Sequence, residues 1–175
     1  MPEAFWSAFF WSWKGEAQFA AYALLFCLCL ARGAAPERIL SGVLLAMPAV
    51  DRLHHAVVGG SIVWRHADLG HVAIDAVVMA CTFVVALHAN RVYPLWIAGA
   101  QIISVFGHAY RLGLEEINRN AYDTMAVTPS YIQLVAMIAG IAFHMSRRRR
   151  LGSYPSWRRS SSLTQAHAAG TSPVG

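Results

Sequence analysis

The chain has 175 residues, of which 57% are hydrophobic and only 13% charged, and its mean hydropathy is +0.43. Soluble globular domains carry about 25% charged residues, so the composition argues against a soluble domain and predicts an integral membrane protein. The net charge of +5 does not indicate nucleic-acid binding, because six of the fourteen basic residues follow position 146, where a membrane anchor explains them. Three cysteines, all within apolar segments, argue against a disulfide framework.

Residues 1–15 are predicted to form a short interfacial amphipathic helix. Aromatic residues at high density favour the headgroup region of a bilayer, and here they share one helical face: Phe5, Trp6, Phe9, Phe10 and Trp13. Residues 16–146 then form a transmembrane helical domain. Residues 147–175 are expected to be a basic tail, disordered because serine, glycine and proline dominate it.

Apolar segments predict an all-α bundle of about five transmembrane helices. The first needs extension past Arg32, whose side chain can snorkel, because fifteen residues cover only about 22 Å of a roughly 30 Å core. The second continues as a more polar helix to Gly59. Four spans remain an alternative if the first two segments form a re-entrant hairpin. The five predicted segments are residues 17–35, 36–50, 70–88, 94–110 and 131–145.

Four consecutive arginines, Arg147 to Arg150, directly follow the last apolar segment. Such clusters stay on the cytoplasmic side of a membrane, which predicts a cytoplasmic C-terminus and, with five spans, an external N-terminus. Abundant arginine and alanine with a single lysine are typical of a GC-rich bacterial genome. We therefore expect a multi-pass protein of a bacterial inner membrane.

Each predicted helix after the first carries one polar stripe, the pattern expected where helices pack against each other. Asp75 is the deepest acid, and an unpaired carboxylate at that depth would be costly, so it needs a proton or a partner. His71, His108 and Arg111 are candidate partners. The predicted topology gathers an interhelical polar cluster in the outer part of the membrane, formed by Asp51, His71, Asp75, Gln101, His108 and Gln133.

Three interpretations of this cluster stay open. Its members can form hydrogen bonds that only set helix packing. Alternatively, they can bind a transition metal or haem, with His55, His71, Asp75 and His108 as candidate ligands, although no specific metal motif is present and no cofactor is predicted. In the third interpretation, Asp75 and His71 relay protons.

An Arg-Val-Tyr-Pro-Leu-Trp turn opens the stretch from Arg91 to Gln101, and His108 follows one helical stretch later. Together with Ala121-Tyr122 and Pro129-Ser130-Tyr131, this pattern resembles a group of small uncharacterised bacterial inner-membrane proteins over residues 70–145. The resemblance implies a multi-pass membrane protein. It brings no activity, cofactor or catalytic residue.

Phosphate-binding loops, nucleophile elbows and paired-cysteine zinc motifs are absent from the sequence, which favours a non-enzymatic protein. We expect an accessory or interaction subunit that contacts the lipid bilayer and other membrane subunits or a second copy of itself, but no nucleic acid. The alternative is a histidine-liganded metal or haem protein in redox chemistry or transport, or a proton-coupled path through Asp75.

Overall fold

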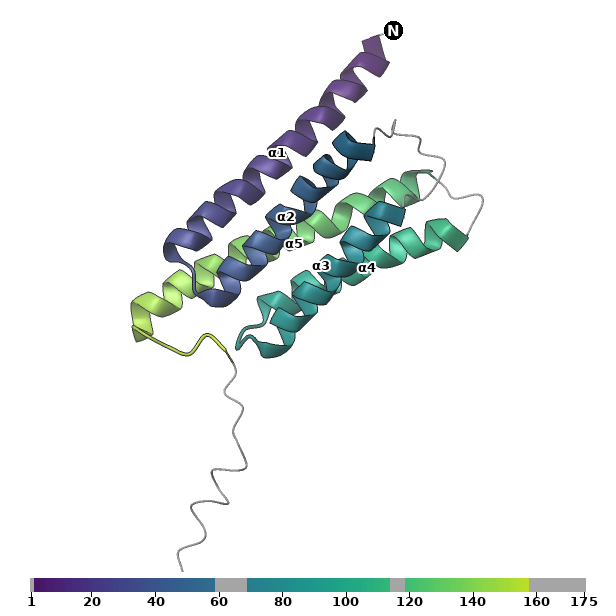
Figure 1. The fold of residues 1–175 in the computed structure, drawn as a ribbon. Helices are drawn as coiled ribbons and strands as arrows, with labels where there is room; N and C mark the ends of the chain where they lie inside the picture. Colours follow the sequence, from purple (N-terminus) through teal and green to yellow (C-terminus); the bar gives the residue numbers. More distant parts are fainter. Residues whose placement is uncertain (1, 59–68, 114–118, 158–175) are drawn as a thin grey trace, which may run out of the picture.

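The computed structural model describes residues 2–58, 69–113 and 119–157, with side chains in 13–57, 70–110 and 127–157 (Figure 1). The described residues contain no strand, so the predicted all-α class is confirmed. Consecutive helices lie side by side and run in alternating directions (Figure 1). The five helices are α1 (Pro2–Arg32), α2 (Ala35–Val58), α3 (Leu69–His88), α4 (Tyr93–Gly113) and α5 (Arg119–Leu151).

Helix α1 is continuous from Pro2 to Arg32, so the predicted boundary between an interfacial helix and a first span near residue 15 is not present. The short polar stretch around Gly15 contains no proline, and a single glycine lowers the stability of a helix by only about 1 kcal/mol. Contacts with α2 stabilise this part of α1. Arg52 forms an ion pair of 3.0 Å with Glu16 and lies 4.3 Å above the ring of Phe19.

Three segments among the described residues are long and apolar enough to cross a membrane, and the prediction of five is therefore wrong by this criterion. In α2 the apolar stretch between Arg38 and Asp51 has 12 residues, which cover about 18 Å of a roughly 30 Å core. In α4 polar side chains interrupt the apolar sequence. The three segments are Trp13–Arg32, Gly70–His88 and Val127–Leu151.

The turn between α1 and α2 is tight and self-capped. A Cβ on Gly33 would lie 2.6 Å from the carbonyl oxygen of Cys29, so this position requires glycine. The Glu37 side chain accepts a hydrogen bond of 3.1 Å from the backbone N–H of Ala34, as the acidic member of a capping box does. Pro36 occupies the first turn of α2, where its missing N–H has no cost. The turn thus fixes Glu37 at the end of the bundle.

Helix α5 continues through the four arginines and ends at Leu151, beyond the predicted boundary of the helical domain at residue 146. Gly152, with a φ of +68°, ends the helix, and its N–H donates to the carbonyl of Arg148. The chain then turns back towards the start of α4, where the N–H of Asn90 donates to the carbonyl of Ser156. Residues 153–157 thus belong to the folded domain, and the rest of the predicted tail lies outside the described residues.

All five helices contribute to the main hydrophobic core, which lies around Leu40, Ile97 and Met137, all of them fully buried. Large apolar side chains also cover the outside of the bundle, and Leu24 and Phe143 are 72% and 73% exposed. An apolar outer surface suits a protein that is surrounded by lipid. The inside, in contrast, holds seven buried polar side chains among the described residues: Glu37, Ser41, Asp75, Thr82, Gln101, Gln133 and His144.

Candidate functional site

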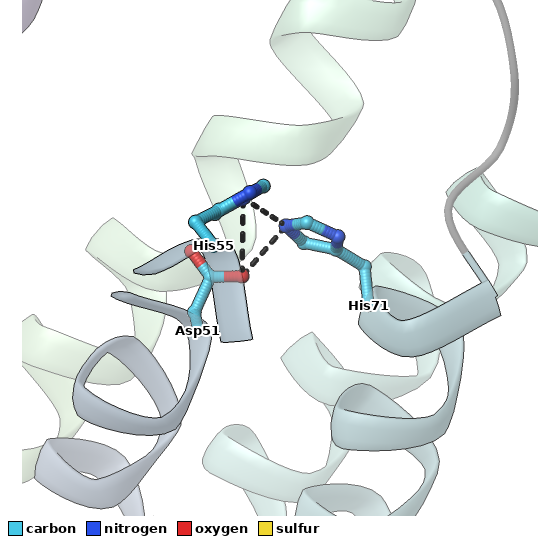
Figure 2. A group of neighbouring side chains, drawn as sticks. All are labelled: Asp51, His55 and His71. Carbon is cyan, nitrogen blue, oxygen red and sulfur yellow. Dashed lines mark hydrogen bonds and ion pairs between the residues drawn. The ribbon is translucent and has the colours of Figure 1, made fainter. Parts of the chain in front are cut away.

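Two histidines and one aspartate meet where the end of α2 faces the first turn of α3 (Figure 2). Asp51 and His55 lie four residues apart on α2, which places them on the same face of the helix. The Nε2 atom of His71 on α3 lies 2.6 Å from Oδ1 of Asp51 and 3.2 Å from Nε2 of His55. His55 Nε2 and Asp51 Oδ1 are 4.0 Å apart. We call these three residues the histidine–aspartate cluster.

The average spacing within the histidine–aspartate cluster is close to that of ligands around a small metal ion. Ligand atoms at about 2.0–2.1 Å from a tetrahedral zinc ion are separated by about 3.3–3.4 Å. The three separations of 2.6, 3.2 and 4.0 Å lie on either side of this value. The side chains remain 30–38% exposed, so solvent reaches the position that an ion would occupy.

Electrostatics favour an ionised carboxylate in this cluster. Burial alone would raise the pKa of Asp51, but the hydrogen bond from His71 and the charges of His71, His55 and His54 lower it below its usual value. The ring of His54 lies 5.8 Å from that of His55 and 6.0 Å from that of His71. Three imidazoles therefore surround one carboxylate, which suits a site for a cation once the imidazoles are neutral.

A second polar group, the Asp75 network, lies one helical turn deeper along α3. Oδ2 of Asp75 lies 3.0 Å from Nε2 of His108 and accepts a hydrogen bond of 2.8 Å from the Ser104 hydroxyl. Oδ1 accepts a hydrogen bond of 3.1 Å from the amide of Gln101. Gln133 on α5 in turn donates to the side-chain oxygen of Gln101. The network thus links α3, α4 and α5 and satisfies the Asp75 carboxylate with several donors.

The structure divides the predicted interhelical cluster into these two groups. Asp51 and His71 belong to the first, whereas the Asp75 network holds Asp75, His108 and the two glutamines. Among the predicted metal candidates, His55 and His71 lie together, but the carboxylate beside them is Asp51 rather than Asp75. The Arg111 side chain lies outside the described residues, and His108 is the histidine that pairs with Asp75.

A third polar group, which was not predicted from the sequence, lies at the opposite end of the bundle. Glu37 is fully buried, its Oε1 lies 3.0 Å from Nε of Arg91, and it accepts a hydrogen bond of 3.2 Å from the Tyr93 hydroxyl. The hydroxyl of Tyr154 contacts both Arg91 and, at 2.7 Å, Nδ1 of His144. The sequence holds only part of a capping-box signal here, because Glu37 follows Pro36 in the first turn of α2 but alanine rather than serine or threonine stands at position 34.

No protein-family model, curated protein or solved structure matches this chain. The site geometry therefore carries the functional argument alone.

Proposed function

We propose that this membrane protein binds a divalent transition-metal ion through Asp51, His55 and His71. The observation that supports the proposal is the convergence of two imidazole nitrogens and one carboxylate oxygen from two helices, all within 4.8 Å of one another. Imidazole suits zinc, iron, nickel and copper, and sites with two histidines and one carboxylate hold zinc or iron(II) with open coordination positions. Partial exposure of the cluster fits such an open position, where water or a substrate binds.

A haem is a poorer fit to the same cluster. Two axial ligands stand on opposite sides of the porphyrin plane, whereas Nε2 of His55 and Nε2 of His71 are only 3.2 Å apart. The two nitrogens are close enough to share one ion at adjacent coordination positions. They leave no space for a macrocycle between them. We therefore assign the cluster to a free metal ion.

We place the arginine-rich end of α5 in the cytoplasm of a bacterial cell, following the distribution of positive charge. Helices α1, α3 and α5, which hold the three apolar segments, run in the same direction (Figure 1). The histidine–aspartate cluster lies at the start of α3, and Ala89, directly after α3, contacts Trp157 near the arginines. The metal then binds on the outer side of the inner membrane.

A proton path through Asp75 is a second candidate. The observation that favours it is a buried carboxylate with a histidine 3.0 Å away and two glutamines extending the network into α5. In proteoliposomes Asp75→Asn should then abolish proton flux, and unchanged flux would exclude this candidate. The interpretation as an accessory subunit, with partner subunits or a second copy, stays a prediction.

Metal titration of the detergent-purified protein tests the main proposal. We expect one zinc ion per chain by calorimetry and elemental analysis, and at least a 10-fold loss of affinity in His55→Gln and in His71→Gln, since even groups that only orient a ligand contribute about 10–100-fold. His88→Gln is the matched control, because His88 lies at the far end of α3 and its hydrogen bond among the described residues is to the carbonyl of Val84 in its own helix. Equal affinity in all three variants would refute the proposal.

A further inference from the structure

A groove runs along the outside of the bundle between α4 and α5, away from the histidine–aspartate cluster. Its volume is about 760 Å³, within the range of about 300–1,000 Å³ that is typical of ligand sites. Three of its lining side chains, Trp96, Val135 and Phe143, are strongly exposed, so the groove opens to the surroundings of the bundle. Gly140, at the base of the groove, packs against the ring of Tyr93, and a Cβ at position 140 would lie only 2.7 Å from that ring.

The length of the groove matches one leaflet of a bilayer. From Tyr131 to Phe143, one face of α5 contributes almost only apolar lining residues. Twelve residues of helix cover about 18 Å, and half of a roughly 30 Å hydrocarbon core is about 15 Å. The apolar part of the groove therefore has the length of an acyl chain that reaches from the headgroup region to the bilayer centre.

Two arginines close the groove at the end of the bundle that carries the four consecutive arginines. Arg91 and Arg147 both line it, and their guanidinium groups lie 4.9 and 4.6 Å from the ring centre of Tyr154. The Arg91 side chain is only 7% exposed, and its ion pair with Glu37 uses Nε. Its Nη2 atom is buried without a hydrogen-bond partner among the described residues. Such a donor is costly unless an acceptor from outside the chain reaches it.

We infer that this groove binds one anionic phospholipid, with its phosphate at Arg91 and Arg147 and one acyl chain along α4 and α5. Arginine binds phosphate through paired N–H donors, and Glu37 balances only one of the two positive charges, which leaves the headgroup end positive. The adjacent Arg148 adds to this charge and disfavours a headgroup that carries its own cation. The inference does not depend on the metal site, which lies at the other end of α3.

Native mass spectrometry of the full chain in a neutral detergent tests the inference. We expect one phosphatidylglycerol to be retained per chain, but neither phosphatidylcholine nor inorganic phosphate. Arg147→Gln should weaken phosphatidylglycerol binding about fivefold, the effect of one arginine near an anionic headgroup. Arg149→Gln is the matched control, because it removes the same charge from the same helix end without lining the groove. Ala139→Phe should fill the groove and abolish retention.

Three of the four results that would overturn the inference are equal retention of phosphatidylcholine and phosphatidylglycerol, an equal effect of the two arginine variants, and unchanged binding in Ala139→Phe. Binding of inorganic phosphate as strong as that of the lipid would instead assign the arginines to a free anion and also refute it. If Ala139→Phe fails to fold, as judged by its circular dichroism spectrum, two comparisons still test the inference: phosphatidylglycerol against phosphatidylcholine, and Arg147→Gln against Arg149→Gln.

Discussion

Replacement of Asp75 by alanine should lower the stability of the bundle by about 2–5 kcal/mol. The carboxylate makes three contacts to α4, at 2.8 Å to Ser104, 3.1 Å to Gln101 and 3.0 Å to His108. An interhelical hydrogen bond in a membrane protein contributes about 0.6–1.7 kcal/mol, and three of them give the stated range. The three donors would also remain inside the bundle without their acceptor, which places the result in the upper half of the range.

The assay is reversible unfolding in mixed micelles with increasing dodecyl sulfate, followed by circular dichroism. Thr82→Val is the matched control, because Thr82 is as deeply buried on α3 but its hydroxyl bonds the carbonyl of Met79 in its own helix. We expect the control to lose less than about 1 kcal/mol. If Asp75→Ala were no less stable than Thr82→Val, the Asp75 network would not hold α3 against α4, and the reasoning would be refuted.

Three further results are expected. Zinc binding should weaken as the pH falls, because protons compete with the metal for the imidazole nitrogens; calorimetry over pH 3–8 checks this, and a pH-independent zinc affinity would contradict it. The pKa of Asp51 is lowered by its histidines, so Asp51 should keep its contribution to stability until the pH falls below the usual aspartate range, which melting curves over the same pH range check. Gly140→Ala should cost about 1–3 kcal/mol in the same unfolding assay, because the new Cβ meets the ring of Tyr93, and a neutral effect would contradict the packing described. Glu37→Gln should cost about 3–5 kcal/mol by leaving Arg91 buried without its counter-charge, and Glu16→Gln, whose ion pair is exposed, is the control that should change stability by less than about 1 kcal/mol.

The sequence was sufficient to predict the helical class and the approximate positions of the helices, because long apolar segments separated by polar turns have few other solutions in a membrane. It overestimated the number of spans. In α2 the charged residues Arg38 and Asp51 limit the apolar stretch to 12 residues, and in α4 polar side chains such as Gln101 interrupt the apolar sequence. Apolar content alone does not distinguish a helix that faces lipid from one that packs polar side chains against a neighbouring helix.

The candidate site was predictable in its residue types but not in its pairing. The spacing of Asp51 and His55 on one helical face can be read from the sequence, since residues four apart are neighbours on a helix. Which of them meets His71 depends on how α2 and α3 are rotated about their axes, and no local pattern encodes that rotation. The contact between Glu37 and Arg91 was missed for a related reason, because these residues are far apart in the chain and meet only when two turns lie at the same end of the bundle.

X-ray absorption spectroscopy of the zinc-loaded protein tests the central claim most directly. Binding by Asp51, His55 and His71 predicts only nitrogen and oxygen neighbours at about 2.0–2.2 Å, with the scattering of two imidazole rings that falls to one ring in His71→Gln. A sulfur shell near 2.3 Å would place the ion on cysteine instead. That result, or a spectrum unchanged by His71→Gln, would contradict the assignment of the metal to this end of the bundle.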